Sequence, residues 1–185
     1  MGANSAHAVE KDDAVFHLPG HPLPALVTLN STDGSGVDLF MLSLRRPVLL
    51  NLFAMPVRSG QVDLGAAAQH ESAQQLRAVN AELDALRQEM PDVAVLGLSL
   101  HEPECLRRVR DELQLRFELL SDRQRAWTDR LELPLQRWDD GSMALRRCTM
   151  LLVEGQVSRL DFPLRQPTEV GRRAVELLRR ETGAM

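Results

Sequence analysis

The sequence contains no tyrosine, and aromatic residues make up only 4% of its 185 residues. Proteins that bind single-stranded nucleic acid stack bases on aromatic side chains, so this scarcity argues against such a surface. The 22 basic and 26 acidic residues give a net charge of −4, which argues against a general affinity for nucleic acid. We therefore expect no nucleic-acid partner.

Cysteine is almost absent as well, since only Cys105 and Cys148 occur. Their spacing fits neither a zinc site nor a C-x-x-C redox pair, so we expect no metal and no cofactor. Cys105 falls in a predicted helix and Cys148 in a predicted buried strand. A disulfide requires Cα atoms within about 7 Å, so we expect the two thiols to stay unpaired.

Long hydrophobic runs are also missing. The longest, at 47–55, is far shorter than the roughly 20 residues that a membrane-spanning helix needs. The first residues lack a basic start followed by an apolar run, which is the pattern of a signal peptide. We expect a cytoplasmic protein without a membrane partner, with residues 1–21 as a flexible N-terminal arm.

Hydrophobic residues make up 44% of the chain, enough to build the core of one domain over 22–185. The stretch 47–54 is apolar at nearly every position, which predicts a central strand buried on both faces. A second buried strand is predicted at 93–99, a short one at 117–120, and a hairpin over 148–162 around Glu154 and Gly155. A weaker hairpin is predicted near 25–29 and 37–39.

Amphipathic helices alternate with these strands. Apolar residues at helical spacing predict one helix over 73–90 and another from Pro103. Ser121 or Asp122 is expected to cap a third helix that ends near Leu131. The last helix covers the stretch after Pro167, and its core face is Val170, Ala174, Leu177 and Leu178. This order predicts α/β layers, with a mixed sheet and helices on both faces.

Several phrases in this order resemble the peroxiredoxins, thioredoxin-fold peroxidases that include the alkyl hydroperoxide reductases and thiol peroxidases. They are "LPALVTLNSTDGSGVDL", "VAVLGLSL" with Pro103 close behind, "LLSDRQRAWTDRLEL" and "LRRCTMLLVEGQVSRLDFPL". The resemblance implies a thioredoxin-like, peroxiredoxin-type fold with three α/β/α layers and a mixed central sheet. It also connects the chain with antioxidant, thiol-dependent oxidoreductases and with homodimers.

The sequence departs from that family at the active site. Family members carry Pro-x-x-x-Thr/Ser-x-x-Cys after the strand that corresponds to 47–54. The cysteine lies in the first turn of a helix, where backbone N–H groups and the helix dipole favour the thiolate. Here the first cysteine of the chain is Cys105, so no alignment of the motif places a thiol at that point.

Two counts align the motif differently because the loop is longer than usual. Counting forward from the strand puts Ala54, Arg58 and Gln61 at the proline, threonine and cysteine positions. Counting backward from the helix over 73–90 puts Gln69 at the cysteine position instead. The family's active-site arginine, in its Arg-x-Thr phrase, matches Arg147. We call Arg58, Gln61, Gln69 and Arg147 the vestigial site.

Arg147 has two interpretations that the sequence leaves open. It can contact a small anionic or polar ligand at the vestigial site, or it can form a structural ion pair at the strand edge, because a charge in an apolar strand needs a partner. Its neighbour Arg146 is equally able to be the solvent-facing residue. Cys148 reads as a core residue.

Cys105 lies in the first turn of the helix after Pro103, a setting that can lower the pKa of a thiol. The neighbouring Glu102 and Glu104 oppose thiolate formation. Cys105 is therefore either a reactive thiol or an ordinary, partly buried cysteine.

The other candidates are weaker. His17 and His21 lack an obvious third metal ligand, and His70 is either a general base near the vestigial site or a solvated histidine at a helix start. Ser59 and Ser72 show no nucleophile elbow. Trp138 is a pocket cap, a dimer contact or a lid on the core.

Two functions follow from these observations. The first is a peroxiredoxin-like protein that has lost the peroxidatic cysteine and acts in binding or regulation. The alternative is an atypical thiol peroxidase that reduces hydroperoxides with Cys105. Similarity of fold does not by itself carry function, so the site has to decide between them.

Overall fold

The computed structural model describes residues 13–58, 61–63, 65 and 69–183. Its middle layer is a seven-stranded sheet with the order β11-β10-β3-β6-β7-β1-β2. These strands are β1 (Leu29–Ser31), β2 (Gly36–Val37), β3 (Val48–Leu52), β6 (Ala94–Ser99), β7 (Glu118–Ser121), β10 (Cys148–Val153) and β11 (Gln156–Asp161). Two small hairpins lie outside this sheet, β4 (Val57–Arg58) with β5 (Gln61–Val62), and β8 (Leu135–Arg137) with β9 (Met143–Leu145).

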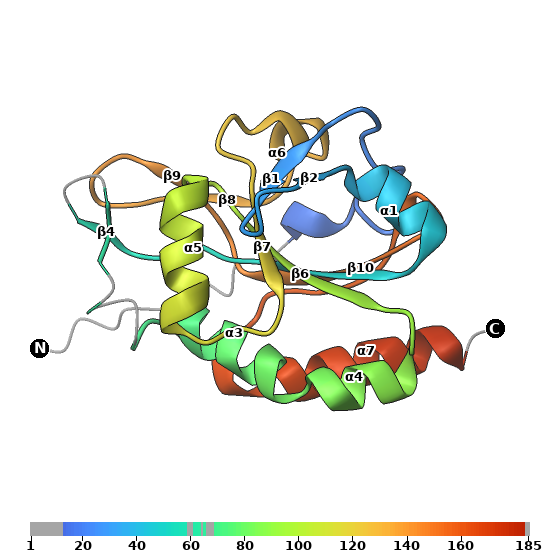
Figure 1. Ribbon diagram of the computed structural model, residues 1–185. Helices are drawn as coiled ribbons and strands as arrows, with labels where there is room; N and C mark the ends of the chain where they lie inside the picture. Colours follow the sequence, from blue (N-terminus) through green and yellow to red (C-terminus); the bar gives the residue numbers. More distant parts are fainter. Residues whose placement is uncertain (1–12, 59–60, 64, 66–68, 184–185) are drawn as a thin grey trace, which may run out of the picture.

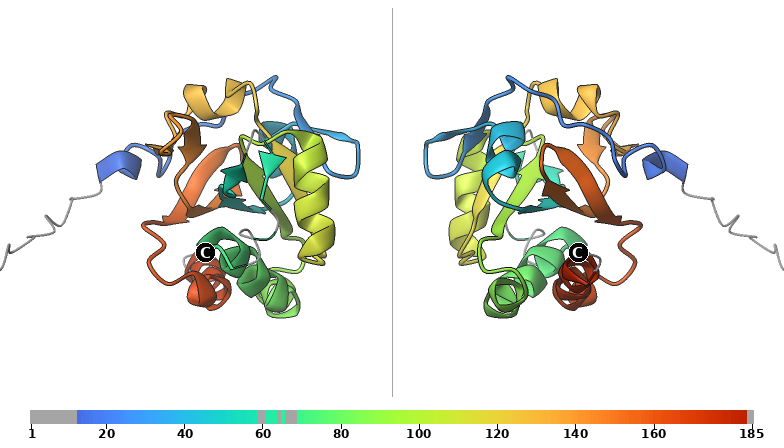
Figure 2. Two further views of the ribbon diagram at one scale, coloured as in Figure 1. Left: turned by 90° about the vertical axis from the view of Figure 1, so that its left-hand side faces the viewer. Right: turned by 90° about the vertical axis from the view of Figure 1, so that its right-hand side faces the viewer.

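Helices cover both faces of the sheet, as Figures 1 and 2 show. One face carries α1 (Leu39–Arg45) and α6 (Ala126–Arg130). The other packs against α3 (Glu71–Ala81), α4 (Leu83–Glu89), α5 (Pro103–Glu112) and α7 (Val170–Thr182). Two short 3₁₀ helices, η1 (Asp13–Val15) and η2 (Pro167–Glu169), complete the elements. The predicted three-layer α/β/α architecture is confirmed.

The sheet is mixed, and β3 lies inside it. Strand β3 pairs in parallel with β6 and antiparallel with β10, and all five of its residues are buried. Leu49 belongs to the core cluster under α3 and α7, whereas Leu50 belongs to the cluster under α1 and α6. The apolar run at 47–54 was therefore a correct sign of a strand with helices on both sides.

Strands β3, β6 and β7 are mutually parallel, so their carboxyl ends meet at one edge of the sheet. The chain leaves β3 through Ala54 and Met55 and leaves β6 through Leu100 and His101. Open α/β sheets bind their ligands outside the carboxyl ends of the strands. This edge is therefore where a site is expected.

The hairpin of β10 and β11 turns at Glu154 and Gly155, as predicted. Both residues have positive φ angles, +50° and +78°, which is the requirement of a type I′ turn. The cap of α6 agrees with the sequence only in part. The carboxylate of Asp122 accepts from the backbone N–H groups of Trp127 (3.3 Å) and Thr128 (2.6 Å) in the first turn, but the residue at the N-cap position is Arg125.

Three sequence-based boundaries are wrong. The helix expected over 73–90 is two helices, because Glu82 leaves the helical conformation (ψ 8°) and its N–H bonds to Val79 instead of the fourth residue back. The apolar spacing continues across this break and so could not reveal it. The first strand begins at Leu29 instead of near residue 25, and residues 39–45 form a helix that Asp38 caps by accepting from the N–H of Met41.

The glycine at 171 explains how closely α7 approaches α3. A Cβ atom at Gly171 would lie 2.1 Å from the carbonyl oxygen of Ala78, a backbone atom that cannot move aside. The glycine therefore allows the two helices to touch, and this contact holds α3 against the sheet. In the described part of the chain no helix has the length and apolar character required to cross a bilayer.

The flexible arm expected over 1–21 is too long. Val15 and Leu18 are buried in the core cluster under α6, and the N–H of Gly20 donates to the carbonyl oxygen of Val157 at 2.7 Å. Residues 13–21 are therefore part of the domain. Residues 1–12 lie outside the described residues.

Replacing Val15 with Ala should lower the free energy of unfolding by about 1.5 kcal/mol, because two buried methyl groups are lost. The adjacent Phe16 is 77% exposed, so Phe16→Ala is a matched control that should change stability by less than about 0.5 kcal/mol. Urea denaturation of the three proteins measures both values. Equal effects of the two substitutions would contradict the docking of this segment.

Candidate functional site

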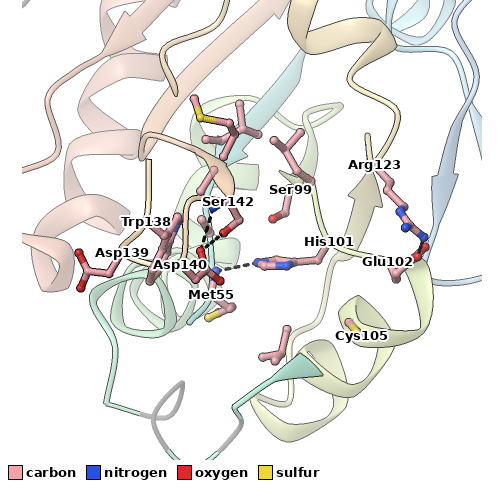
Figure 3. A pocket seen from close by; sticks show the side chains of 16 residues that line it. Met55, Ser99, His101, Glu102, Cys105, Arg123, Trp138, Asp139, Asp140 and Ser142 are labelled. Carbon is pink, nitrogen blue, oxygen red and sulfur yellow. Dashed lines mark hydrogen bonds and ion pairs between the residues drawn. The ribbon is translucent and has the colours of Figure 1, made fainter. Parts of the chain in front are cut away.

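Two cavities lie near the carboxyl ends of the parallel strands. The smaller one, of about 400 Å³, opens where α3 begins, beside the start of β10. We call it the Arg147 pocket; its lining includes His70, Glu71, Ser72, Trp138, Arg147 and Phe162. The larger one, of about 590 Å³, lies beyond the ends of β3 and β6. We call it the His101 pocket; its lining includes Met55, Ser99, His101, Cys105, Trp138 and Leu145 (Figure 3).

Arg147 brings a nearly buried guanidinium to the smaller pocket. Its Nη2 donates to a carboxylate oxygen of Glu71, in the first turn of α3, at 2.7 Å. The arginine side chain is only 15% exposed, while that of Glu71 is 60% exposed. The Nη1 group is buried, and no described residue accepts a hydrogen bond from it. The ion pair of the second interpretation therefore forms, while the contact with a ligand stays a prediction, and Nη1 has no partner among the described residues.

His70 shapes the same pocket as a helix cap. Its Nδ1 accepts from the N–H of Ser72 at 3.2 Å, and its ring stacks on Trp138 with centroids 5.9 Å apart. Burial lowers the pKa of His70; the charge of Arg147 lowers it further, while Glu71 opposes the shift. His70 therefore favours the neutral form and uses Nδ1 for the helix, which fits the role of a cap better than that of a general base.

The charge balance of the Arg147 pocket favours an anion. Three arginines line it, Arg137, Arg146 and Arg147, against the two carboxylates Glu71 and Asp139. The N-terminus of α3 adds the positive end of a helix dipole. Arg146 also lies 4.7 Å above the ring of Phe162.

The remaining residues of the vestigial site are placed elsewhere. Arg58 and Gln61 pair with each other through their backbones in the β4–β5 hairpin. Their side chains lie outside the described residues, and so does Ser59. Gln69 is exposed and directly precedes the cap residue of α3. Of the two residues whose side chains are described, Arg147 lines the pocket at α3 and Gln69 does not.

Neither cysteine lies in the Arg147 pocket, and both are free thiols. Cys148 is fully buried at the start of β10, and burial raises the pKa of its thiol far above the ordinary value. Cys105 is partly buried on α5 and lines the His101 pocket. The N-terminus of α3, where a thiolate would be stabilised, carries Glu71 and Ser72 instead.

His101 is the central polar group of the larger pocket. It lies two residues after the end of β6, and its Nε2 accepts from the N–H of Met55 at 3.0 Å (Figure 3). Burial lowers the pKa of His101 to about 4, so the ring is neutral at physiological pH. At the edge of this pocket Glu102 forms an ion pair with Arg123.

The other candidates have structural partners. The Nε2 of His17 lies 3.0 Å from the carbonyl oxygen of Leu131, and the Nδ1 of His21 lies 2.9 Å from that of Pro22. The described residues contain no group of three or more metal-ligating side chains. Ser72 is fully buried, and its hydroxyl accepts from the N–H of Ala54 at 3.4 Å. Trp138 lines both pockets, which supports the interpretation of a pocket wall.

The sequence did not point to Glu71, Ser99 or His101. Ser99 and His101 had a usable signal, because polar residues at the end of a buried parallel strand often face a ligand. No signal in the sequence pointed to Glu71, because its partner Arg147 is far away in the sequence and the ion pair exists only in the folded chain.

Comparison with solved structures agrees with this description. The structure superposes on peroxidoxin BcpB from Mycobacterium tuberculosis with a TM-score of 0.68, at 14% identity, over 88% of this chain and 97% of that one. PrxQ from Xylella fastidiosa gives a TM-score of 0.66 at 15% identity, over 90% and 96% of the two chains. The bacterioferritin comigratory protein of Xanthomonas campestris, described for its alkyl peroxide reduction activity, gives 0.67 at 16% identity, over 86% and 96%.

No protein-family model matches the sequence, and no curated protein matches it. At these identities the likeness establishes the fold. The chain thus has the thioredoxin-like fold of the peroxiredoxins, as its sequence predicted.

Proposed function

We propose that this protein is a peroxiredoxin-fold binding protein that does not reduce peroxides, and that its Arg147 pocket takes a small carboxylate or another oxoanion. One observation carries the proposal. The guanidinium of Arg147 is nearly buried beside a helix N-terminus, and its Nη1 has no partner among the described residues. A buried charged donor without an acceptor is costly, and an anionic ligand would supply the acceptor.

The chemistry of peroxide reduction supports the first part of the proposal, namely that this protein does not reduce peroxides. A thiolate must attack the peroxide oxygen, and serine, glutamine or histidine cannot replace it. Cys148 is sealed in the core, and Cys105 lies in a different pocket. Groups that act as a unit contribute little when one is missing, so the arginine and helix N-terminus would retain little of the activity.

Ligand binding would use what the pocket still offers. The free Nη1 of Arg147 donates to one oxygen of the anion, and the N-terminus of α3 favours its negative charge. Phe162, Leu164 and the ring of Trp138 supply apolar surface for the remainder of the molecule. A carboxylate with a small apolar group fits this combination, and benzoate serves as the probe.

The alternative is an atypical thiol peroxidase. One observation favours it, because Cys105 borders a cavity that also holds His101 and Arg123. Against it, Arg123 is already paired with Glu102, so its charge is partly neutralised.

A peroxide assay separates the two functions. We expect the wild-type protein to consume hydrogen peroxide and an organic hydroperoxide no faster than an ordinary free thiol does. The measurement is a stopped-flow or coupled assay with a thiol reductant on wild type, Cys105→Ser and Cys148→Ser. Rapid turnover that Cys105→Ser abolishes would establish the alternative. Rapid turnover that survives both substitutions would exclude both functions as stated.

A further inference from the structure

We infer that the His101 pocket is a second binding site, for a small uncharged molecule that has an apolar body and one hydroxyl or carbonyl group. This inference is independent of the anion site, since the polar groups on which it rests, Ser99 and His101, do not line the Arg147 pocket. Two unengaged polar groups, the surrounding apolar walls and the charge at the rim lead to it.

Ser99 supplies the first unengaged group. It is the last residue of β6, its residue exposure is 0%, and its hydroxyl has no hydrogen-bond partner among the described residues. Buried hydroxyl groups in folded proteins are nearly always hydrogen-bonded. Figure 3 shows Ser99 and His101 facing the same space, so a ligand there would reach the hydroxyl.

His101 supplies the second. Because its Nε2 accepts from the N–H of Met55, the proton of the neutral ring must be on Nδ1. No described residue accepts a hydrogen bond from this Nδ1–H. Because His101 and Ser99 both line the pocket, it offers one donor with a fixed proton and one hydroxyl that can both donate and accept. A ligand with a carbonyl or hydroxyl oxygen can bond to either group.

The walls select an apolar body. Met55, Leu100, Leu145 and the indole of Trp138 line the same cavity. Its volume of about 590 Å³ lies within the range of pockets that hold small ligands, roughly 300 to 1,000 Å³.

The charges at the rim disfavour an anion. Asp139 and Asp140 are exposed there, whereas the positive charge of Arg123 is paired with Glu102. Asp140 already accepts from the N–H and hydroxyl of Ser142, so it does not offer a free carboxylate for a cation. The His101 pocket therefore selects against the ligands that suit the Arg147 pocket, although Trp138 and Asp139 are common to both.

Benzyl alcohol is the probe for this site, with toluene, benzoate and benzylamine as analogues of similar shape. We expect benzyl alcohol to bind with a roughly millimolar Kd and to move the indole N–H resonance of Trp138 in NMR titrations. Trp127, the other tryptophan, is fully buried and lines neither pocket, so its resonance is the internal control. Toluene, benzoate and benzylamine should bind this pocket at least about three-fold more weakly, because each loses a hydrogen bond or adds a charge. Their binding here is followed at His101, since Trp138 also lines the Arg147 pocket.

Ser99→Ala tests the polar contact. The substitution should weaken the binding of benzyl alcohol by about three- to ten-fold, because one hydrogen bond is lost. The affinity for toluene should not change. The substitution should also hold or raise the melting temperature, because it removes an unpaired buried hydroxyl. Thr128→Val removes another buried, unpaired hydroxyl from a residue that lines neither pocket; it is the matched control and should leave the binding of benzyl alcohol unchanged. A second readout, independent of any variant, is the ¹⁵N shift of His101 Nδ1, which benzyl alcohol should move.

The inference is overturned by any of three results: benzyl alcohol leaves Trp138 and His101 unmoved, toluene binds as tightly as benzyl alcohol, or Ser99→Ala binds benzyl alcohol like wild type. Failure of benzoate to bind the Arg147 pocket would count against the proposed function alone.

Discussion

Replacing Arg147 with Met should weaken benzoate binding by about 10- to 100-fold, the effect of losing a hydrogen bond between charged groups. Methionine keeps an apolar stem of similar length but removes all three guanidinium nitrogens. In the wild-type protein Nη2 of Arg147 donates to Glu71, whereas Nη1 has no partner among the described residues and is the group that we propose for the ligand. Isothermal titration calorimetry or an NMR titration measures the change.

Three further variants make this result specific. Arg137 lines the same pocket but is exposed, so its charge is screened and Arg137→Gln should change the affinity less than about three-fold. Arg147→Lys should fall between wild type and Arg147→Met, since it keeps the charge and loses the planar fork. Glu71→Gln should tighten benzoate binding, because the competing carboxylate loses its charge. Equal losses from the substitutions of Arg137 and Arg147 would show only a general effect of positive charge.

Acidification should destabilise the protein through His101, by about 2 to 3 kcal/mol between pH 6.5 and pH 4, after allowance for its residual contact with water. Burial lowers the pKa of this histidine from 6.5 to about 4 in the folded protein. Between pH 6.5 and pH 4 the histidine therefore binds a proton in the unfolded chain but stays neutral in the folded chain. The stabilisation is complete above pH 6.5 and is lost as the pH falls toward 4.

His101→Gln separates this contribution from those of other groups. Glutamine can still offer an oxygen to the N–H of Met55, but it does not titrate. We expect its unfolding free energy to fall less steeply with acidification than that of wild type. The groups that share the cavity with His101, namely Cys105, Glu102, Asp139, Asp140 and Arg123, remain in both proteins.

The lowered pKa of His70 acts in the same direction in both proteins and so cancels from the comparison. Urea denaturation at several pH values from 4.5 to 7.5 gives the two curves. Parallel curves for wild type and His101→Gln would contradict the assignment.

Both predictions depend on the same edge of the sheet. The chain leaves β3 and β6 there, and two pockets that share Trp138 in their linings lie near it, one with the guanidinium of Arg147 and one with the uncharged ring of His101. A peroxiredoxin-type fold without a thiol at α3 thus still provides two environments of different polarity.

The sequence alone determined that the fold consists of a sheet covered by helices on both faces. The run at 47–54 has no polar face, and only a strand covered on both sides buries such a run. The spacing of Val170, Ala174, Leu177 and Leu178 likewise required a core under the last helix, and all four are buried. The sequence also determined the absence of a thiol at α3, since no cysteine precedes Cys105.

The sequence could not determine the break at Glu82 or the docking of residues 13–21. In both places the hydrophobic pattern is the same for the two outcomes, and tertiary packing chooses between them. The need for glycine at position 171 could not be predicted from the sequence either. It arises from the close approach of the backbone of Ala78, which belongs to another helix.

The site was decided by tertiary structure for the same reason. Arg147 could be named from its neighbours in sequence, but its pairing with Glu71 and its free Nη1 depend on where α3 meets β10. His101 is an unremarkable histidine until the N–H of Met55 and the surrounding burial fix its proton on Nδ1. Hydrogen bonds and desolvation act over a few ångströms, and the residues that exert them here are brought together only when the chain folds.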